Sequence, residues 1–534
     1  MTSPSATAMS VRLQEIAAAG KLSDLRWPNF SDYRADFLQL YQASNFSLLW
    51  LGPNGQPTPQ AFSVIQALES SRQKGLIPDD YDAARWQGRL AALKAKADPT
   101  TEANFDAALT VCTMRYISDL HIGRVNPKHF NFGIDIQNKK YNLPQFIGQD
   151  LIHAANMQAI LNDVEPSYAG YKRTEVALQH YLQLAAKGDG PLLPEVTKTI
   201  SSGDMYAGIS PLAQRLELLG DLPQTASVNP GSQIYAGALV DGVKMFQDRH
   251  GMVADGKLGK ETIRQLNVSL SFRVQQLDDA LERWRWLPPS FPQPPVVVNV
   301  PEFVLRVFTA DHKVALKMNV VVGKAVRHQT PVFAKDMQYI VFRPYWNVPT
   351  SILRSEIVPA IVKNRNYIAN KNFEVVTYSG TVVTSGPISD DVLAQLRAAK
   401  LMVRQKPGPD NALGLVKFLF PNEHSVYLHS TPAQSLFSQS RRDFSHGCIR
   451  VQRPAELAAY LLRNQPPWTL EKVQAAMQTG PNNQQVNLKA PIPVLILYIT
   501  AVVEEDGSVH FFNDIYGHDK SLEALLAKGP PYPG

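Results

Sequence analysis

The stretch that decides the fold is Val296-Val297-Val298-Asn299-Val300 followed by Phe303-Val304-Leu305-Arg306-Val307-Phe308. Both runs are dense in β-branched residues and Pro301 marks a turn between them, which together predict a β-hairpin. Directly before them stands the proline-rich run Leu287-Pro288-Pro289-Ser290-Phe291-Pro292-Gln293-Pro294-Pro295, which no helix can cross. We therefore expect the chain to change here from a helical half to a strand-rich half.

Similar runs downstream of the hairpin continue the sheet. Residues 317–323 and 339–342 are again rich in β-branched residues, and together they predict an antiparallel, sandwich-like domain or a barrel over residues 296–480. Residues 347–410 interrupt this sheet. An insertion of that length is typical of a binding loop or a lid, so we expect a capping subdomain there. The final segment, 481–534, is expected to add strands and a helix that complete the N-terminal half.

The N-terminal half has a different periodicity. Apolar residues recur at helical spacing through residues 10–195, which predicts a helical scaffold. Residues 196–268 contain short apolar runs that end at glycines, as in a small three-helix module. Residues 269–295 are expected to form a helix and a proline-rich linker. The chain as a whole is therefore predicted to be a multidomain α+β protein.

The composition has an ordinary globular balance. Hydrophobic residues make up 44% and charged residues 19% of the 534 residues, with a formal net charge of +6. Basic residues form no block of the kind that binds nucleic acid, so no nucleic-acid partner is expected. Met1-Thr2-Ser3-Pro4-Ser5 lacks the apolar core of a signal peptide, and the best apolar window, 492–503, is too short to span a bilayer. We expect either a cytosolic protein or one whose signal is absent from this sequence.

Reactive residue types concentrate in Ser445-His446-Gly447-Cys448-Ile449-Arg450, with His429 preceding Ser445 by 15 intervening residues. A nucleophilic thiol needs a histidine to take its proton. His429 is the expected base because it arrives from a neighbouring strand, in preference to the sequence neighbour His446. Gly447 lets the backbone approach a carbonyl group, so its N–H and that of Cys448 are expected to form an oxyanion hole.

Other interpretations of this cluster stay open at the level of spacing. His424, His429, His446 and Cys448 offer metal ligands, but their spacing fits no usual zinc pattern and no paired cysteine is present. A redox-sensor thiol would lack a resolving cysteine nearby, and packing without chemistry is a further alternative. The second cysteine, Cys112, lies in an apolar helical run and is expected to be a buried structural thiol rather than a disulfide partner. His121 is expected to be a helix-end histidine, because its helix should end at Gly123.

Longer motifs give a family resemblance. The segment from His429 to Arg450 resembles the His-x(15)-Ser-His-Gly-Cys signature of the YkuD-type L,D-transpeptidases, with Arg450 as one variant of the last position. Further runs resemble the large YcbB-like branch of that family: Leu120–Arg124, Arg283–Pro288, Val322–Lys324, Gln329–Pro331, Tyr345–Pro349, Asn411–Gly414 and Tyr427–Pro432. Phe246-Gln247 with Gly251, and Asp255-Gly256 with Gly259 and Thr262, resemble the peptidoglycan-binding module.

This resemblance implies a periplasmic enzyme that cross-links the bacterial cell wall without a metal or another cofactor. Cys448 would attack the diaminopimelate–D-Ala bond of a donor tetrapeptide stem, and the thioester would pass to an acceptor stem as a 3→3 cross-link. Carbapenems would acylate the same thiol. The catalytic residues it implies are Cys448, His429, Ser430 (through its carbonyl), Gly447 and Tyr427. The substrate-binding residues it implies are Arg450, His446, Ser445, Trp346 and Asn411.

Alternatives remain for the role of Arg450 and for the function of the protein. Instead of binding substrate, Arg450 could form a structural salt bridge behind the site. An L,D-carboxypeptidase, or a hydrolase of wall-anchored protein, would use the same thioester with a different acceptor. A non-catalytic wall-binding protein would rest on the 196–268 module. Membrane association is expected only through a signal or anchor that this sequence lacks.

Overall fold

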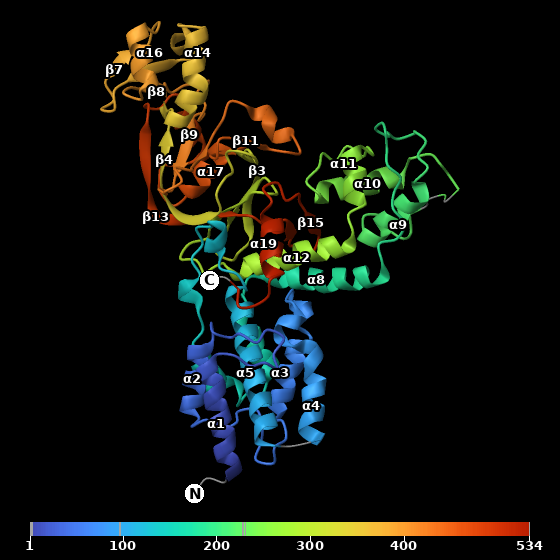
Figure 1. The fold of residues 1–534 in the computed structure, drawn as a ribbon. Helices are drawn as coiled ribbons and strands as arrows, with labels where there is room; N and C mark the ends of the chain where they lie inside the picture. The colour runs from blue at the N-terminus through green and yellow to red at the C-terminus, as the bar shows by residue number, and fades with distance from the viewer. Residues whose placement is uncertain (1–3, 96–97, 227–228, 230, 533–534) are drawn as a thin grey trace. The chain divides into compact units, whose positions relative to one another are not determined.

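The computed structural model describes residues 4–95, 98–226, 229 and 231–532, so the first three residues of the expected signal-free N-terminus lie outside it. The chain forms two compact units (Figure 1). One contains the residues up to Ser290 together with those from Tyr498 onward, and the other is Phe291–Leu497. Helices dominate the first unit and strands the second, which confirms the multidomain α+β organisation. Among the described residues, no helix is long and apolar enough to cross a membrane.

The scaffold is built around one long buried helix, α5 (Pro99–Ile122). Asp98 caps its N-terminus, where the carboxylate accepts hydrogen bonds from the amides of Thr100 and Thr101. Side chains on all sides of α5 are buried, as expected for a helix at the centre of a core. The helices that share this core are α1 (Pro4–Ala19), α2 (Arg34–Ala43), α3 (Pro59–Glu69), α4 (Trp86–Ala95) and α7 (Met157–Val164).

Helix α5 also accounts for two residues that the sequence singled out. Cys112 is fully buried in it, and burial raises the pKa of the thiol to about 12, which confirms a structural cysteine. The helix ends before Gly123, and Nδ1 of His121 lies 2.7 Å from the carbonyl oxygen of Val164. The helix-end reading of His121 is therefore confirmed.

Residues after the scaffold form a small helical module with its own apolar core. Its helices are α9 (Ile209–Leu219), α10 (Ala238–Arg249) and α11 (Lys260–Leu266). The Asp-Gly turn between α10 and α11 is held by Gln247, whose side chain accepts from the amide of Gly256 and donates to the carbonyl of Lys257. The module therefore folds as the glycine-punctuated pattern predicts.

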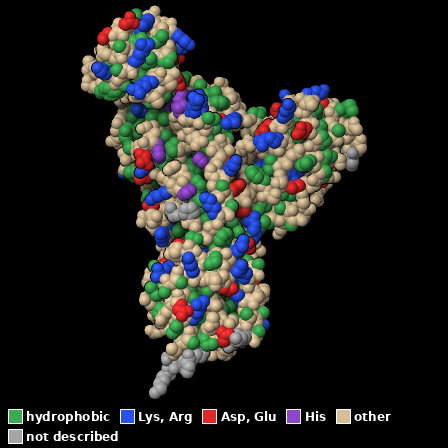
Figure 2. Space-filling view, viewed as in Figure 1, with side chains coloured by type: hydrophobic (Ala, Val, Ile, Leu, Met, Phe, Trp, Pro, Cys, Tyr) green, Lys and Arg blue, Asp and Glu red, His purple; other side chains and the backbone are tan. Residues whose placement is uncertain are grey.

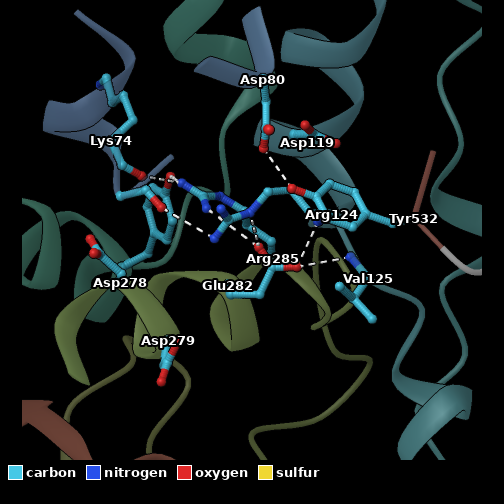
Figure 3. Close-up of polar contacts among 12 residues, drawn as sticks. Lys74, Asp80, Asp119, Arg124, Val125, Asp278, Asp279, Glu282, Arg285 and Tyr532 are labelled. Carbon is cyan, nitrogen blue, oxygen red and sulfur yellow. Dashed lines mark hydrogen bonds and ion pairs between the residues drawn. The ribbon is translucent and has the colours of Figure 1, made fainter. Parts of the chain in front are cut away.

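Helices α8 (Ala169–Lys187) and α12 (Leu270–Arg285) pack along one another in the first unit. Helix α12 is the helix expected within residues 269–295, and most of its side chains are buried. A buried polar cluster explains how so polar a helix enters a core (Figure 3). Glu282 accepts hydrogen bonds from the amides of Arg124 and Val125 at 2.6 and 3.1 Å. The proline-rich run from Pro288 follows α12.

The C-terminal segment joins this unit through the same cluster, in which the hydroxyl of Tyr532 donates to Asp80 at 2.5 Å (Figure 3). The unit also contains β14 (Ala501–Val503), β15 (Val509–Phe511) and α19 (His518–Leu526). Strand β13 (Gln484–Leu497) instead pairs with two strands of the second unit. The expected change of unit at 480/481 is therefore wrong, because the chain leaves the second unit after Leu497.

The second unit is organised by one sheet, with strand order β11-β3-β12-β10-β9-β4-β13-β1-β2 and an additional pairing of β2 with β3. Its remaining strands are β1 (Val296–Asn299), β2 (Val304–Phe308), β3 (Val314–Gly323), β4 (Phe333–Phe342), β9 (Val416–Leu419), β10 (Leu428–His429), β11 (Asp443–Ser445) and β12 (Ile449–Val451). β1 and β2 pair antiparallel, as the opening hairpin predicts. Helices α17 (Pro454–Leu461) and α18 (Leu470–Gln478) follow β12.

The pairing closes the sheet on itself. On β3 the Val320 amide donates to the Phe303 carbonyl, whereas the Asn319 carbonyl accepts from the Gln452 amide. Neighbouring residues of a strand direct their backbone groups to opposite edges, so β2 and β12 flank β3 on opposite sides and the ring of strands is closed. Of the two expected forms, the sheet is thus the barrel. The expectation of a purely antiparallel sheet is wrong, because β1–β13, β10–β12 and β11–β3 are parallel.

The expected capping insertion has its own sheet, with order β5-β8-β6-β7, and its own apolar core. The strands are β5 (Trp346–Asn347), β6 (Phe373–Val376), β7 (Val382–Thr384) and β8 (Met402–Gln405), accompanied by α14 (Val358–Lys363) and α16 (Asp390–Arg397). We call residues 346–405 the cap. Acidic and basic side chains are interspersed over the face of the molecule visible in Figure 2, in keeping with a small net charge.

Candidate active site

The site lies on the outer face of three adjacent barrel strands, β9, β10 and β12. Val416, Phe418, Leu428, Ile449 and Val451 are fully buried and fill the barrel interior. Because side chains alternate along a strand, their neighbours point outward. These outward residues are Lys417 and Leu419 on β9, Tyr427 and His429 along β10, and Cys448 and Arg450 along β12.

The strand register decides which of these side chains are direct neighbours. β10 and β12 are parallel, with His429 opposite Arg450, and the amide of Ile449 bonds to the carbonyl of Tyr427. Tyr427 is therefore the residue level with Cys448, and His429 is its diagonal neighbour. Diagonal neighbours on adjacent strands lie about 7 to 8 Å apart at the backbone, a span that side chains can bridge. The role of His429 as the base remains a proposal.

The loop that carries Cys448 is fixed from inside. The Ser445 hydroxyl donates to the Cys448 carbonyl at 2.6 Å and accepts from the Gly447 amide at 3.1 Å. Thr330 donates its hydroxyl to the Gly447 carbonyl at 2.8 Å. Gly447 has a φ of +114°, which favours glycine. The loop is thus held in the conformation that presents the thiol.

Two expectations for this loop are corrected by these bonds. Ser445 is 2% exposed and its hydroxyl is used within the loop, so it positions the thiol instead of binding substrate. The Gly447 amide is occupied by Ser445 and is not available as an oxyanion donor. The Cys448 amide has no partner among the described residues and is the remaining candidate of the expected pair.

The thiol of Cys448 is uncharged at neutral pH. Burial raises its pKa above the ordinary 9.0, and this effect exceeds the opposing influence of hydrogen bonds from Tyr427 and of the Arg450 charge. Burial, together with the contact between its hydroxyl and the Cys448 sulfur, raises the pKa of Tyr427. Tyr427 is therefore the side chain that directly contacts the nucleophile. A resting thiolate would require a stronger positive field than the site provides.

His429 is also neutral. It is 4% exposed, and its Nδ1 lies 2.5 Å from the carbonyl oxygen of Ser430, as the resemblance implied. A carbonyl can only accept, so Nδ1 carries the proton and Nε2 keeps the lone pair that a base needs. Burial lowers the pKa of this imidazole to about 3, with further lowering by the charges of Arg450 and Lys417.

Gly414 packs directly against Ser430, the residue whose carbonyl oxygen holds His429. Its φ is +62°, and a Cβ atom there would lie 2.5 Å from the Ser430 hydroxyl oxygen. Only a residue without a side chain lets this loop approach so closely.

Arg450 has no carboxylate partner among the described residues. Burial lowers its pKa, and its Nε is buried without a hydrogen bond. The competing role of Arg450 in a structural salt bridge is therefore wrong, and its guanidinium is available to an anion.

Two other expected substrate-binding residues, His446 and Asn411, lie where the cap meets the barrel. Nε2 of His446 lies 2.7 Å from Oε1 of Glu356 in the cap, and its ring packs 4.7 Å from that of His328. Asn411 is 1% exposed, and its side chain donates to the carbonyls of Pro344, Gln405 and Lys406. Asn411 therefore ties together the two chains of the cap's neck, and the expectation that it binds substrate is wrong.

Trp346 is partly buried on β5, where its ring lies 6.1 Å from that of Phe373 in the cap. Its role in substrate binding remains a proposal. No group of three or more metal-ligating side chains occurs among the described residues, and Cys112 and Cys448 are both free thiols.

Sequence reasoning missed Lys417, Thr330 and Glu356. Lys417 alternates with the buried Val416 and Phe418, which is a strand signal. The pairing that places it beside His429 cannot be read from that signal, however. Thr330 and Glu356 act through contacts with residues 117 and 90 positions away.

Known proteins are similar to this chain in three segments. Residues 294–478 match the YkuD model, described as "L,D-transpeptidase catalytic domain". Residues 207–266 match "Putative peptidoglycan binding domain", and residues 35–178 match "Scaffold domain". A "Putative L,D-transpeptidase" from Haemophilus influenzae is 32% identical over 227 residues, which cover 42% of this chain and 45% of that protein. The chain thus spans about half the length of that relative.

Proposed function

We propose that this chain, which carries a YkuD-type L,D-transpeptidase catalytic domain with a peptidoglycan-binding module and a scaffold domain, is a peptidoglycan L,D-transpeptidase that forms 3→3 cross-links. The observation that carries the proposal is the outer-face cluster. It combines a thiol on a fixed loop, a histidine whose Nδ1 is held by the Ser430 carbonyl, and an arginine without an acidic partner. A substrate in the cell wall implies a location outside the cytoplasm, in the periplasm.

In the first half-reaction the Cys448 sulfur attacks the carbonyl carbon between diaminopimelate and D-Ala, and its proton passes to Nε2 of His429. The Cys448 amide would donate to the oxyanion that forms. The C–N bond then breaks, and His429 returns the proton to the departing amine of D-Ala. The products are a thioester on Cys448 and free D-Ala.

In the second half-reaction the side-chain amine of an acceptor stem attacks the thioester. His429 takes a proton from that amine, the C–S bond breaks, and the proton returns to the sulfur. The result is an amide between two diaminopimelate residues. Water in place of the amine would make the same site a carboxypeptidase or a hydrolase of wall-anchored protein, so the acceptor alone separates these activities.

Two measurements test this proposal. Intact mass spectrometry with a tetrapeptide stem, and with a carbapenem, should show a covalent adduct in the full chain and none in Cys448→Ala. Incubation with purified sacculi should then yield 3→3 dimers. A module that only binds the wall would give no adduct with either reagent, and accumulation of tripeptides without dimers would favour the hydrolytic alternative.

A further inference from the structure

A row of polar side chains crosses the active-site face. Lys417 on β9 is the register partner of His429 on β10, which in turn is the partner of Arg450 on β12. Paired residues on adjacent strands project from the same face, with Cβ atoms about 5 Å apart. Lys417 and Arg450 therefore flank His429 on its two sides.

Neither cation of this row is neutralised by the protein. Lys417 has no hydrogen-bond or ion-pair partner among the described residues, and burial lowers its pKa with no carboxylate to oppose the effect. Arg450 has no ion pair either. By contrast, the buried Arg306 of this unit pairs with Glu302 at 2.6 Å. Both side chains are partly buried, and an unpaired charge that is partly removed from water is costly, so two such cations on one face indicate a place for anionic groups.

The expected substrate carries such groups. A tetrapeptide stem has carboxylates on its D-glutamate, on its diaminopimelate side chain and at its D-Ala terminus. We propose that Lys417 is a second carboxylate-binding residue of this active site, which together with Arg450 holds two carboxylates of the donor stem on either side of His429. This inference rests on the proposed function and assigns two cations to two of the three carboxylates.

The arrangement links substrate binding to the base. With both cations unneutralised, a proton on His429 would sit between two positive charges, and their charges lower its pKa. Carboxylates that pair with Lys417 and Arg450 cancel those charges, so the imidazole becomes a better proton acceptor when a stem is bound. Lys417 is then a positioning residue that also tunes the base.

The test uses four synthetic donor stems and the full chain. One stem has all three carboxylates free, and each of the other three carries a carboxamide at one of the three positions. Formation of the thioester is followed by intact mass at subsaturating and saturating stem. The variants are Lys417→Met, which keeps the length of the side chain without its charge, and Lys417→Arg. Lys335→Met, at an exposed lysine of β4, is the matched control.

In the wild type we expect two of the three carboxamides to lower kcat/KM, each by about tenfold to hundredfold, the range of a hydrogen bond to a charged group. Lys417→Met should lower kcat/KM for the free-acid stem by a similar factor. In this variant, one of those two carboxamides should no longer lower kcat/KM further. Lys417→Arg should retain that sensitivity, and Lys335→Met should behave as wild type. The position at which a carboxamide no longer changes kcat/KM in Lys417→Met identifies the carboxylate that Lys417 binds.

Several results would overturn this inference. One is a Lys417→Met variant that still discriminates against the same two carboxamides. Another is a wild type slowed by one carboxamide or by none, which needs no variant and stays decisive if Lys417→Met fails to fold. Absence of a thioester with every stem in the wild type would refute the proposed function itself, a distinct outcome.

Discussion

The free enzyme should hold Cys448 as a neutral thiol and not as a thiolate–imidazolium pair. Three side chains surround this sulfur. Tyr427 is level with Cys448 on the adjacent strand, His429 is its diagonal neighbour, and Arg450 lies two residues further along the strand of Cys448. Burial outweighs the hydrogen bonds and charge that would stabilise a thiolate. The cations at Arg450 and Lys417 also oppose a proton on His429. Reactivity toward a small alkylating reagent should therefore depend on pH as that of an ordinary or weaker thiol does.

The direction of the pKa shift bounds the ionised fraction of the Cys448 thiol. With a thiol pKa above 9.0, less than about 3% of Cys448 is ionised at pH 7.5. Burial raises the pKa of this thiol and lowers that of the imidazole to about 3, so transfer of the proton from Cys448 to His429 is unfavourable in the free enzyme. An ion pair is therefore a negligible fraction of the resting enzyme.

The rate of alkylation by iodoacetamide, followed by intact mass between pH 5.5 and 9.5, measures the ionisation of Cys448 directly. The rate should rise nearly tenfold between pH 7 and 8 and show no plateau below pH 9. Cys448→Ser serves as the control, and it should remain unmodified because Cys112 is fully buried with a pKa of about 12. A rate that rises between pH 5.5 and 7 and levels off below pH 8 would show that Cys448 and His429 form an ion pair in the free enzyme.

Further predictions concern the groups around this pair. Tyr427→Phe removes the hydrogen bond to the sulfur and should slow alkylation at pH 8 by about tenfold, since bonds to charged groups contribute about 1.5 to 3 kcal/mol; an unchanged rate would remove Tyr427 from this role. Gly414→Ala should displace Ser430, lower the thioester rate more than about tenfold and destabilise the fold by about 1 to 3 kcal/mol, whereas Gly386→Ala, in an uncrowded part of the cap, should leave the rate unchanged. Asn411→Ala should leave neck carbonyls unsatisfied and cost about 3 kcal/mol in chemical denaturation, and a loss below 1 kcal/mol would contradict a structural role. Glu356→Gln should change stability by less than about 1 kcal/mol, because both partners of the His446 contact are partly exposed, and a larger loss would show that this contact holds the cap.

Local signals were sufficient for much of this protein. The opening hairpin and the end of α5 at Gly123 depend on residues near one another in sequence, so turn chemistry and periodicity predicted them. The neighbour of the thiol depends instead on register between β10 and β12, which are about 20 residues apart. A shift of one residue in that register would move every side chain to the other face. Hence Tyr427, and not His429, could be placed level with Cys448 only from the structure.

Non-local partners explain the remaining errors. The sequence predicts a helix within residues 269–295 but not its burial, because partners such as Arg124, more than 150 residues upstream, allow its Glu282 to be buried. Strands were expected within residues 481–534, but nothing in the sequence of β13 shows that its partners are β1 and β4. Partner choice is a property of the closed barrel, and it places Leu497 in the second unit.

Substrate-dependent basicity of His429 leads to a last prediction. In the free enzyme burial, together with the flanking charges of Arg450 and Lys417, lowers the pKa of His429 to about 3, so His429 is unprotonated throughout the range from pH 4.5 to 7. Bound carboxylates cancel those charges and raise the pKa toward the ordinary value, so a proton can compete for the imidazole as the pH falls through this range. Thioester formation at subsaturating stem, which reports the free enzyme, should therefore be flat between pH 4.5 and 7. At saturating stem the rate should fall as the pH decreases through the same range. Lys417→Met should reduce the difference between the two profiles, because one of the charges that the substrate cancels is already absent. Two superimposable profiles in the wild type would show that the substrate does not neutralise the cations beside the base.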